Sequence, residues 1–170
     1  MKKQNIILIG FMGTGKTVTG RALAERTGME LVDMDAQIEL RAGKTIPEIF
    51  AESGEPGFRV LERNLVKELS TRNGLIISTG GGIVLNPDNL ADFEKTGLVI
   101  CLTASPETIF QRLEKDTTRP LLSGDKKKQI AALLEKRQPL YAAIVHQINS
   151  DDLGPAERAA AILDLYALES

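Results

Sequence analysis

The sequence has little of what marks secreted, membrane-spanning or nucleic-acid-binding proteins. It holds one cysteine in 170 residues, Cys101, so it cannot form an internal disulfide. No apolar run approaches the roughly 20 residues of a membrane span. The formal net charge of -2 gives no large positive field for duplex nucleic acid or an anionic membrane. We therefore expect a cytoplasmic protein whose basic sites are local.

The chain is long enough to bury one sizeable core and too short for two ordinary domains. It has 170 residues, of which 42% are hydrophobic, and one domain is the default at this size. We find no internal repeat, no low-complexity tract and no linker rich in proline and glycine. Residues 1–170 are therefore expected to form a single domain, and we expect it to act as a monomer.

Short apolar runs rich in β-branched residues alternate with helical patterns. The runs predict buried strands at 5–9, 31–33, 75–79 and 98–102, with a weaker one at 147–149. The helical patterns lie near 16–27, 35–42, 46–53, 57–73, 88–96, 106–114, 126–145 and 155–168. Strands that alternate with helices form right-handed βαβ units. We therefore expect a three-layer α/β fold with a central five-stranded parallel sheet covered on both faces.

A glycine-rich segment after the first predicted strand matches the phosphate-binding pattern G-x-x-x-x-G-K-[ST]. The segment is Gly10-Phe11-Met12-Gly13-Thr14-Gly15-Lys16-Thr17, and a predicted helix follows it at once. Glycines let backbone N–H groups converge on phosphate oxygens, and the helix adds its positive N-terminal end. Lys16 can then reach the β- and γ-phosphates while the Thr17 hydroxyl ligates Mg²⁺. The alternative is an ordinary glycine-rich turn.

Two aspartates, Asp33 and Asp35, follow the second predicted strand. Ligands bind beyond the carboxyl ends of parallel strands, so both would face the crevice of the phosphate loop. Their spacing puts both side chains on one side of an extended segment. We assign Asp33 to the metal, through water, and Asp35 to a hydroxyl of the phosphate acceptor, although the reverse assignment also fits. Alternatively, Asp33 ends the strand and Asp35 caps the next helix.

The predicted helix at 57–73 carries charges where its apolar face should be. Relative to Phe58, the leucines Leu61, Leu65 and Leu69 define an apolar arc, and Glu62 lies inside it at about 40°. Arg59 lies at its edge, one turn from Glu62. A buried carboxylate is costly unless it is paired, so Glu62 is expected to hold Arg59 for a task.

A second arginine, Arg137, intrudes on the apolar face of the predicted helix at 126–145. It lies within roughly 60° of Ile130, as Leu133 and Leu134 do. Two inward guanidiniums, from Arg59 and Arg137, suggest a clamp for a carboxylate or phosphate. The alternative for each is a structural ion pair or a side chain that reaches solvent.

Two further segments contain candidate site residues. Residues 115–125 are polar and contain proline and glycine, which predicts a loop that can close over the phosphates and bring Arg119 to the transferring phosphoryl group. Gly80, Gly81 and Gly82 end the third predicted strand and would let the backbone approach a ligand closely. The alternatives are a solvated loop arginine and a simple strand-end turn.

Taken in order, these motifs resemble the shikimate kinase family over nearly the whole chain. Six spaced motifs are far more specific than any one of them. They are the phosphate loop followed by Gly20-Arg21-x-Leu23-Ala24, then Asp33-x-Asp35, Gly54-Glu55-x-x-Phe58-Arg59-x-x-Glu62, Thr79-Gly80-Gly81-Gly82, Arg119-Pro120-Leu121 and Arg137-x-x-x-Tyr141.

The resemblance implies a nucleoside-monophosphate-kinase-like fold with a substrate-binding segment at about 33–62 and a lid at about 115–125. It implies transfer of the γ-phosphate of ATP, with Mg²⁺, to the 3-hydroxyl of shikimate, a step toward chorismate and the aromatic amino acids. Asp35 would contact the ring hydroxyls, and Arg59 and Arg137 the carboxylate.

The same resemblance implies roles for the remaining site residues. The catalytic residues would be Lys16, Asp35 and Arg119. The three glycines and Glu62 would line the substrate, beside an apolar wall of Ile46, Phe50 and Phe58. ATP would contact Gly13, Thr14, Gly15, Lys16, Thr17, Arg112, Arg119 and Pro155, and the metal would contact Thr17 and Asp33.

Other classes of P-loop protein fit the sequence less well. A regulatory GTPase needs a guanine-specifying N-K-x-D, which does not occur in the sequence. A nucleoside monophosphate kinase would have to recognise a base, for which an aspartate pair and two arginines are less suited than for a hydroxy acid. Gluconate kinase is the strongest alternative, because gluconate is also a polyhydroxy carboxylate.

Overall fold

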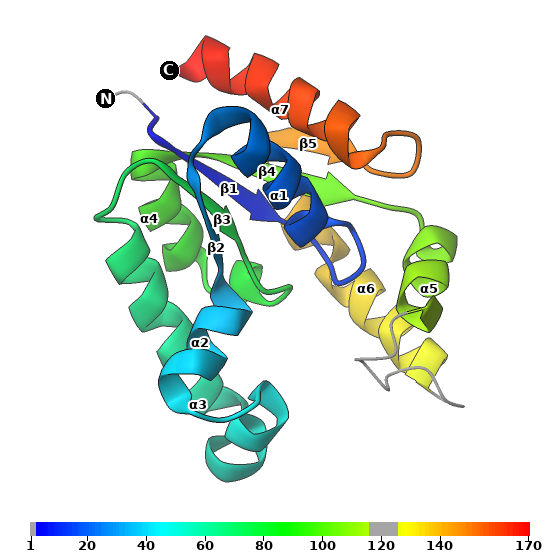
Figure 1. Ribbon diagram of the computed structural model, residues 1–170. Helices are drawn as coiled ribbons and strands as arrows, with labels where there is room; N and C mark the ends of the chain where they lie inside the picture. The colour runs from blue at the N-terminus through cyan, green and yellow to red at the C-terminus, as the bar shows by residue number, and fades with distance from the viewer. Residues whose placement is uncertain (1–2, 116–125) are drawn as a thin grey trace.

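The computed structural model describes residues 3–115 and 126–170, and within these ranges five parallel strands form a central sheet (Figure 1). The strands are β1 (Asn5–Ile9), β2 (Glu30–Asp33), β3 (Leu75–Ser78), β4 (Gly97–Thr103) and β5 (His146–Asn149). Their order across the sheet is β2-β3-β1-β4-β5. The predicted α/β class and the parallel sheet are therefore confirmed.

Helices cover both faces of this sheet. They are α1 (Lys16–Thr27), α2 (Met34–Ala42), α3 (Ile46–Leu69), the short 3₁₀ helix η1 (Ile83–Leu85), α4 (Pro87–Thr96), α5 (Pro106–Lys115), α6 (Lys126–Ala142) and α7 (Pro155–Glu169). Figure 1 shows α1 and α7 side by side on one face of the sheet. Within the described ranges, no helix has the length and apolar character needed to cross a membrane.

Alternating residues of the strands belong to two separate hydrophobic clusters, one on each face of the sheet. In β1, Ile6 and Leu8 pack with Leu23 of α1 and Ile162 of α7. Their neighbours Ile7 and Ile9 join the larger cluster on the other face, which contains side chains of α2, α3, α4, α5 and α6. Successive side chains of a strand point to opposite faces, so a strand covered on both sides reads as a continuous apolar run.

Helix α3 consists of two pieces joined at Gly54. This residue has φ 67° and ψ 179°, which is not helical and favours glycine. The break explains why the sequence pattern predicted separate helices at 46–53 and 57–73. The second piece ends at Leu69 rather than residue 73, because Ser70 begins the turn that leads into β3. Its apolar arc is narrower than predicted, since Leu61 is 39% exposed.

The predicted strand positions hold within one or two residues, and the helix at 126–145 was drawn too long. Helix α6 ends at Ala142, because the chain must turn before β5 starts at His146. Cys101 is fully buried in β4 as expected, and burial raises the pKa of its thiol to about 11.

Asn5 is a buried polar residue at the start of β1. Its side chain has no exposed surface. Its Nδ2 donates to the Arg72 carbonyl at 2.7 Å, and its Oδ1 accepts from the Leu75 N–H at 2.9 Å. One side chain thereby links the first residue of β1 to the turn that leads into β3, the strand that pairs with it.

Replacement of Asn5 by alanine is expected to lower the free energy of unfolding by about 1–3 kcal/mol, because the buried Leu75 N–H and the partly buried Arg72 carbonyl would lose their partner. Urea unfolding of Asn5→Ala and wild type measures the difference. Gln4→Ala is the control, since the Gln4 side chain is exposed, and should stay within about 0.5 kcal/mol of wild type. Equal stability of Asn5→Ala and wild type would contradict the role given to Asn5.

Candidate active site

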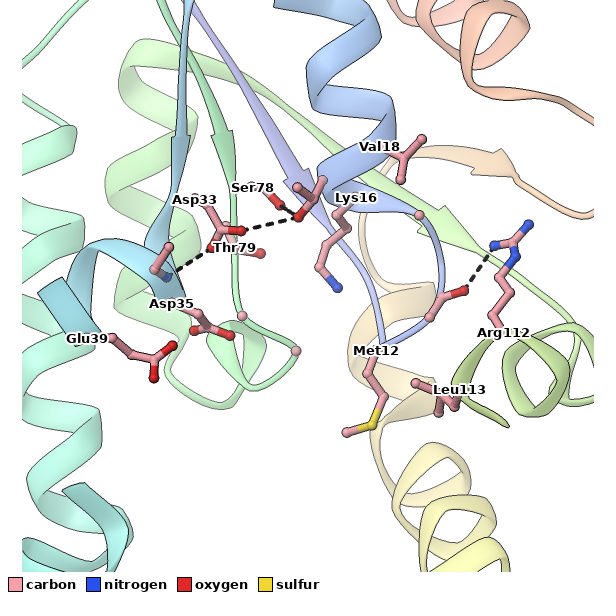
Figure 2. Close-up of a pocket in the computed structure, with 16 residues that line it drawn as sticks. Met12, Lys16, Val18, Asp33, Asp35, Glu39, Ser78, Thr79, Arg112 and Leu113 are labelled. Carbon is pink, nitrogen blue, oxygen red and sulfur yellow. Dashed lines mark hydrogen bonds between the residues drawn. The ribbon is translucent and has the colours of Figure 1, made fainter. Parts of the chain in front are cut away.

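A pocket of about 510 Å³ lies beyond the carboxyl ends of β1, β2 and β3. Its walls come from the loop between β1 and α1, the start of α2, the residues after β3 and part of α5 (Figure 2). β1 and β3 are adjacent in the sheet although β2 lies between them in sequence. Such a change of strand order is where ligands bind in open parallel sheets.

The glycine-rich loop follows β1 and ends at the N-terminus of α1. Gly15 is the N-cap of α1 with φ 91°, a conformation that favours glycine. Thr14 Oγ1 donates to the Phe11 carbonyl at 2.8 Å and thereby braces the loop. Lys16 Nζ donates to the carbonyls of Gly10 at 2.6 Å and Phe11 at 3.0 Å. Figure 2 shows the Lys16 side chain extending into the pocket.

Three oxygen atoms meet beside this loop, from Thr17, Asp33 and Ser78. Thr17 Oγ1 donates to Asp33 Oδ2 at 3.3 Å and lies 3.3 Å from Ser78 Oγ. Hydroxyl and carboxylate oxygens are the ligands that Mg²⁺ prefers, and the set therefore suits that ion. Ser78, the last residue of β3, was not singled out by sequence analysis.

The two aspartates lie on different kinds of backbone, which corrects the sequence prediction. Asp33 ends β2 and is itself the N-cap of α2, because its Oδ1 accepts from the Ala36 N–H at 3.2 Å. Asp35 lies in the first turn of α2 rather than on an extended segment. Both still line the pocket, because the end of a strand and the first turn of the helix that follows it face the same crevice.

Asp35, Arg137 and Arg59 each lie against one residue of the stretch Gly80–Gly82. A Cβ added at Gly80 would lie 2.8 Å from Asp35 Oδ1. One added at Gly81 would lie 3.5 Å from Arg137 Nη1. One added at Gly82 would overlap the Arg59 guanidinium. The structure therefore brings together the three side chains that sequence analysis assigned to the phosphate acceptor, and the absence of side chains at Gly80 and Gly82 makes room for Asp35 and Arg59.

Arg59 is held by two carboxylates of its own helix. Its Nη1 donates to both oxygens of Glu62 at 3.1 and 3.2 Å, and its Nε and Nη2 donate to Glu55 Oε1 at 3.4 and 3.3 Å. Glu62 is only 2% exposed, whereas the Glu55 side chain is 56% exposed. Burial raises the pKa of Glu62, and the Arg59 charge opposes that rise.

Arg59 does not line the pocket of the phosphate loop. It lines a separate pocket of about 330 Å³ together with Glu55, Glu62 and residues at and after the end of η1. Phe58, predicted to form the apolar wall, is buried, and the Arg59 guanidinium lies 5.2 Å from its ring centre. Phe50 stacks near Phe58 with ring centres 5.1 Å apart.

Arg137 approaches the same glycines from α6. Its Nε is buried and has no hydrogen-bond partner among the described residues. One turn further on, Tyr141 donates from its hydroxyl to the Gly81 carbonyl at 2.5 Å and fixes that peptide. Burial raises the pKa of Tyr141 to about 12, so this hydroxyl keeps its proton at neutral pH. A guanidinium whose Nη1 lies beside the Gly81 backbone is suited to bind an anionic ligand.

Two of the residues expected to contact ATP, Arg112 and Pro155, line a third pocket, of about 420 Å³, that adjoins the phosphate loop at Gly15. Arg112 of α5 donates to the Gly13 carbonyl at 2.9 Å and the Ser150 carbonyl at 3.0 Å. Pro155, the first residue of α7, lines the same pocket. The lid residue Arg119 lies outside the described residues.

Sequence analysis missed one arginine of this third pocket. Arg158 lines it and is 4% exposed. It shares a helix face with the buried Ile162, four residues further along α7. The signal was therefore the same as for Glu62 and Arg137: a charge at an apolar position of an amphipathic helix.

Comparison with known proteins gives a consistent result. A family profile described as shikimate kinase matches residues 12–167. A shikimate kinase of Pelotomaculum thermopropionicum is 46% identical over 151 residues, 88% of each chain. One of Thermodesulfovibrio yellowstonii is 42% identical over 164 residues, which cover 96% of this chain and 95% of that protein.

Solved structures agree with the sequence matches. The shikimate kinase of Acinetobacter baumannii in complex with shikimate superposes with a TM-score of 0.88 at 38% identity, over 97% of this chain and 93% of that one. A gluconokinase of Sinorhizobium meliloti reaches a TM-score of 0.63 at 14% identity, over 98% of this chain and 95% of that one, a likeness of fold alone. The profile match over most of the sequence and relatives above 40% identity show that this chain belongs to the shikimate kinase family.

Proposed function

We propose that this protein transfers the γ-phosphate of ATP to the 3-hydroxyl of shikimate. One observation carries the proposal: Asp35, Arg59 and Arg137 lie against three consecutive glycines at the edge of the pocket that holds Lys16. One aspartate and two arginines match an acceptor that bears both a hydroxyl and a carboxylate.

The phosphate side of the reaction would rest on the loop between β1 and α1. Its backbone N–H groups and Lys16 would bind the β- and γ-phosphates, as in other P-loop proteins. Thr17 and Asp33 would hold Mg²⁺, with Asp33 acting through water. The ion would neutralise charge on the phosphate oxygens. Arg119 is expected to add a further positive charge to the transferring group from the segment at 115–125.

On the acceptor side, Asp35 would accept the proton of the attacking hydroxyl, because its carboxylate lines the pocket that Lys16 enters. Arg137 would bind the acceptor carboxylate through the outer nitrogens of its guanidinium, of which Nη1 lies beside Gly81. Arg59 would bind the same carboxylate through its Nε and Nη2 edge, which Glu55 now occupies. An acceptor carboxylate would therefore replace the exposed Glu55, while the buried Glu62 keeps Arg59 in place.

Substrate choice is tested by measuring ATP consumption with shikimate, gluconate and AMP in parallel. Shikimate alone is expected to support rapid turnover. Comparable turnover with gluconate or AMP would contradict the proposed acceptor.

Lys16→Ala is expected to lower kcat with the fold intact, which circular dichroism would check. An unchanged kcat in Lys16→Ala would contradict the role of the loop.

Arg59→Ala is expected to weaken acceptor binding about tenfold or more and ADP binding less than twofold, because the lost contacts are to the acceptor carboxylate. Titration calorimetry with shikimate and with ADP measures both affinities. Arg63→Ala is the control, since Arg63 lies one turn further along α3 and pairs with Asp92 of α4. Equal losses of shikimate and ADP affinity in Arg59→Ala would contradict the assignment.

Glu62 is expected to contribute to the pH dependence of the free energy of unfolding. Its folded-state pKa lies above the ordinary 4.5, so the folded protein binds this proton more tightly than the unfolded chain does. Ionisation of Glu62 therefore costs stability as pH rises above about 4.5. Glu62→Gln cannot ionise, so its free energy of unfolding should increase relative to that of wild type as pH rises from 4.5 toward 7. Urea unfolding of both proteins over that range measures the difference in the free energy of unfolding. A difference that falls as pH rises would mean that pairing with Arg59 outweighs burial.

A further inference from the structure

Arg158 is a buried cation that the proposed reaction has not used. It lies in the second turn of α7 and is 4% exposed. Its Nε donates to Thr19 Oγ1 at 2.8 Å, and its Nη1 donates to the carbonyls of Leu153 at 2.8 Å and Ser150 at 3.4 Å. One guanidinium therefore joins α1, which begins at the phosphate loop, to the segment 150–153.

The charge of Arg158 is not balanced within the described part of the chain. No carboxylate oxygen there lies within 4.0 Å of its nitrogen atoms. The same pocket is lined by a second arginine, Arg112, which also donates to the Ser150 carbonyl, and by Asp151 and Asp152, neither of which forms an ion pair with Arg158. Burial and the Arg112 charge both lower the pKa of Arg158. A buried unpaired cation beside a like charge is costly.

The position of Arg158 indicates which group could balance it. Its Nη2 would lie 3.0 Å from a Cβ added at Gly15, and Arg112 Nη1 would lie 3.7 Å from the same point. The guanidiniums of Arg158 and Arg112 thus both lie close to Gly15, the last glycine of the phosphate loop. Among the described residues, Nη2 of Arg158 donates no hydrogen bond, and the residue lines the 420 Å³ pocket that adjoins the loop.

We propose that Arg158 is a positioning residue of the nucleotide site, which clamps the segment 150–153 against the phosphate loop and is balanced by the phosphates of the bound nucleotide. The proposal rests on the phosphate loop binding ATP, as the proposed function requires. It does not depend on which acceptor is used.

A purely structural role does not explain the choice of an arginine at this position. An apolar side chain of similar size would fill the same space without a desolvated charge, and such replacements are often neutral or stabilising. Arg158 instead makes three hydrogen bonds to two chain segments beside Gly15. We infer from these bonds that its role is to hold the phosphate loop in place. Phosphate binding at a helix N-terminus then adds the missing negative charge.

The variants Arg158→Met and Arg158→Lys test this role. Arg158→Met removes the charge and the donors at similar length. It is expected to raise the Kd for ADP and the KM for ATP about tenfold while the KM for shikimate and kcat at saturating ATP change less than twofold. Arg158→Lys keeps the charge but has one nitrogen in place of the Nε and Nη1 that make these bonds, and about a threefold loss of ADP affinity is expected.

Arg63→Met is the matched control, because Arg63 is also a largely buried arginine and joins α3 to α4 away from this pocket. It is expected to lower the melting temperature and leave the Kd for ADP unchanged. An ADP affinity within twofold of wild type in folded Arg158→Met would overturn the inference. If Arg158→Met does not fold, wild-type ADP affinity in Arg158→Lys would overturn it equally.

The outcome can be separated from that of the proposed function. ADP binding is measured without any acceptor, so a wild-type protein that fails to phosphorylate shikimate would still report on Arg158. Conversely, unaltered ADP binding in the variants would reject the role of Arg158 and leave the proposed acceptor untouched.

Discussion

The site depends on the contact between the stretch Gly80–Gly82 and the three charged side chains that pack against it. A Cβ at Gly80 or Gly82 would occupy space that Asp35 or Arg59 fills, and one at Gly81 would lie in van der Waals contact with Arg137. Because the stretch directly follows a central strand of the sheet, it is fixed relative to the phosphate loop, which follows the adjacent strand. Backbone pairing between β1 and β3 thus sets the distance over which a phosphoryl group would travel.

Buried charged side chains occur on both sides of the site, in two different arrangements. Glu62 is desolvated but paired, and its partner Arg59 is thereby kept in one orientation at the acceptor side. Arg158 is desolvated without an acidic partner in the described residues and lies at the nucleotide side. The first arrangement is complete in the protein alone. The second is complete only with an anionic ligand, which links nucleotide binding to the stability of the fold.

Sequence analysis recovered the features that depend on local rules. The phosphate loop, the buried strands and the intrusion of Glu62 follow from spacing within a few residues. What depends on distant contacts could not be read in this way. Arg158 meets Thr19 across 139 positions, and the pairing of each glycine with one charged side chain depends on the order of the strands. The two aspartates were wrongly placed on one extended segment, because Asp33 both ends a strand and caps the helix that carries Asp35. The role of Arg119 stays a prediction.

The double contact of Asp33 limits how this position can evolve. One carboxylate oxygen caps α2 and the other accepts from Thr17. Asparagine would preserve the cap but carry no negative charge, whereas glutamate would preserve the charge and reach past the helix end. Aspartate combines the helix cap with a negative charge beside Thr17, so both the fold and the proposed chemistry limit substitution at residue 33. The same limit protects the position of Asp35, which lies in the first turn of the helix that Asp33 caps.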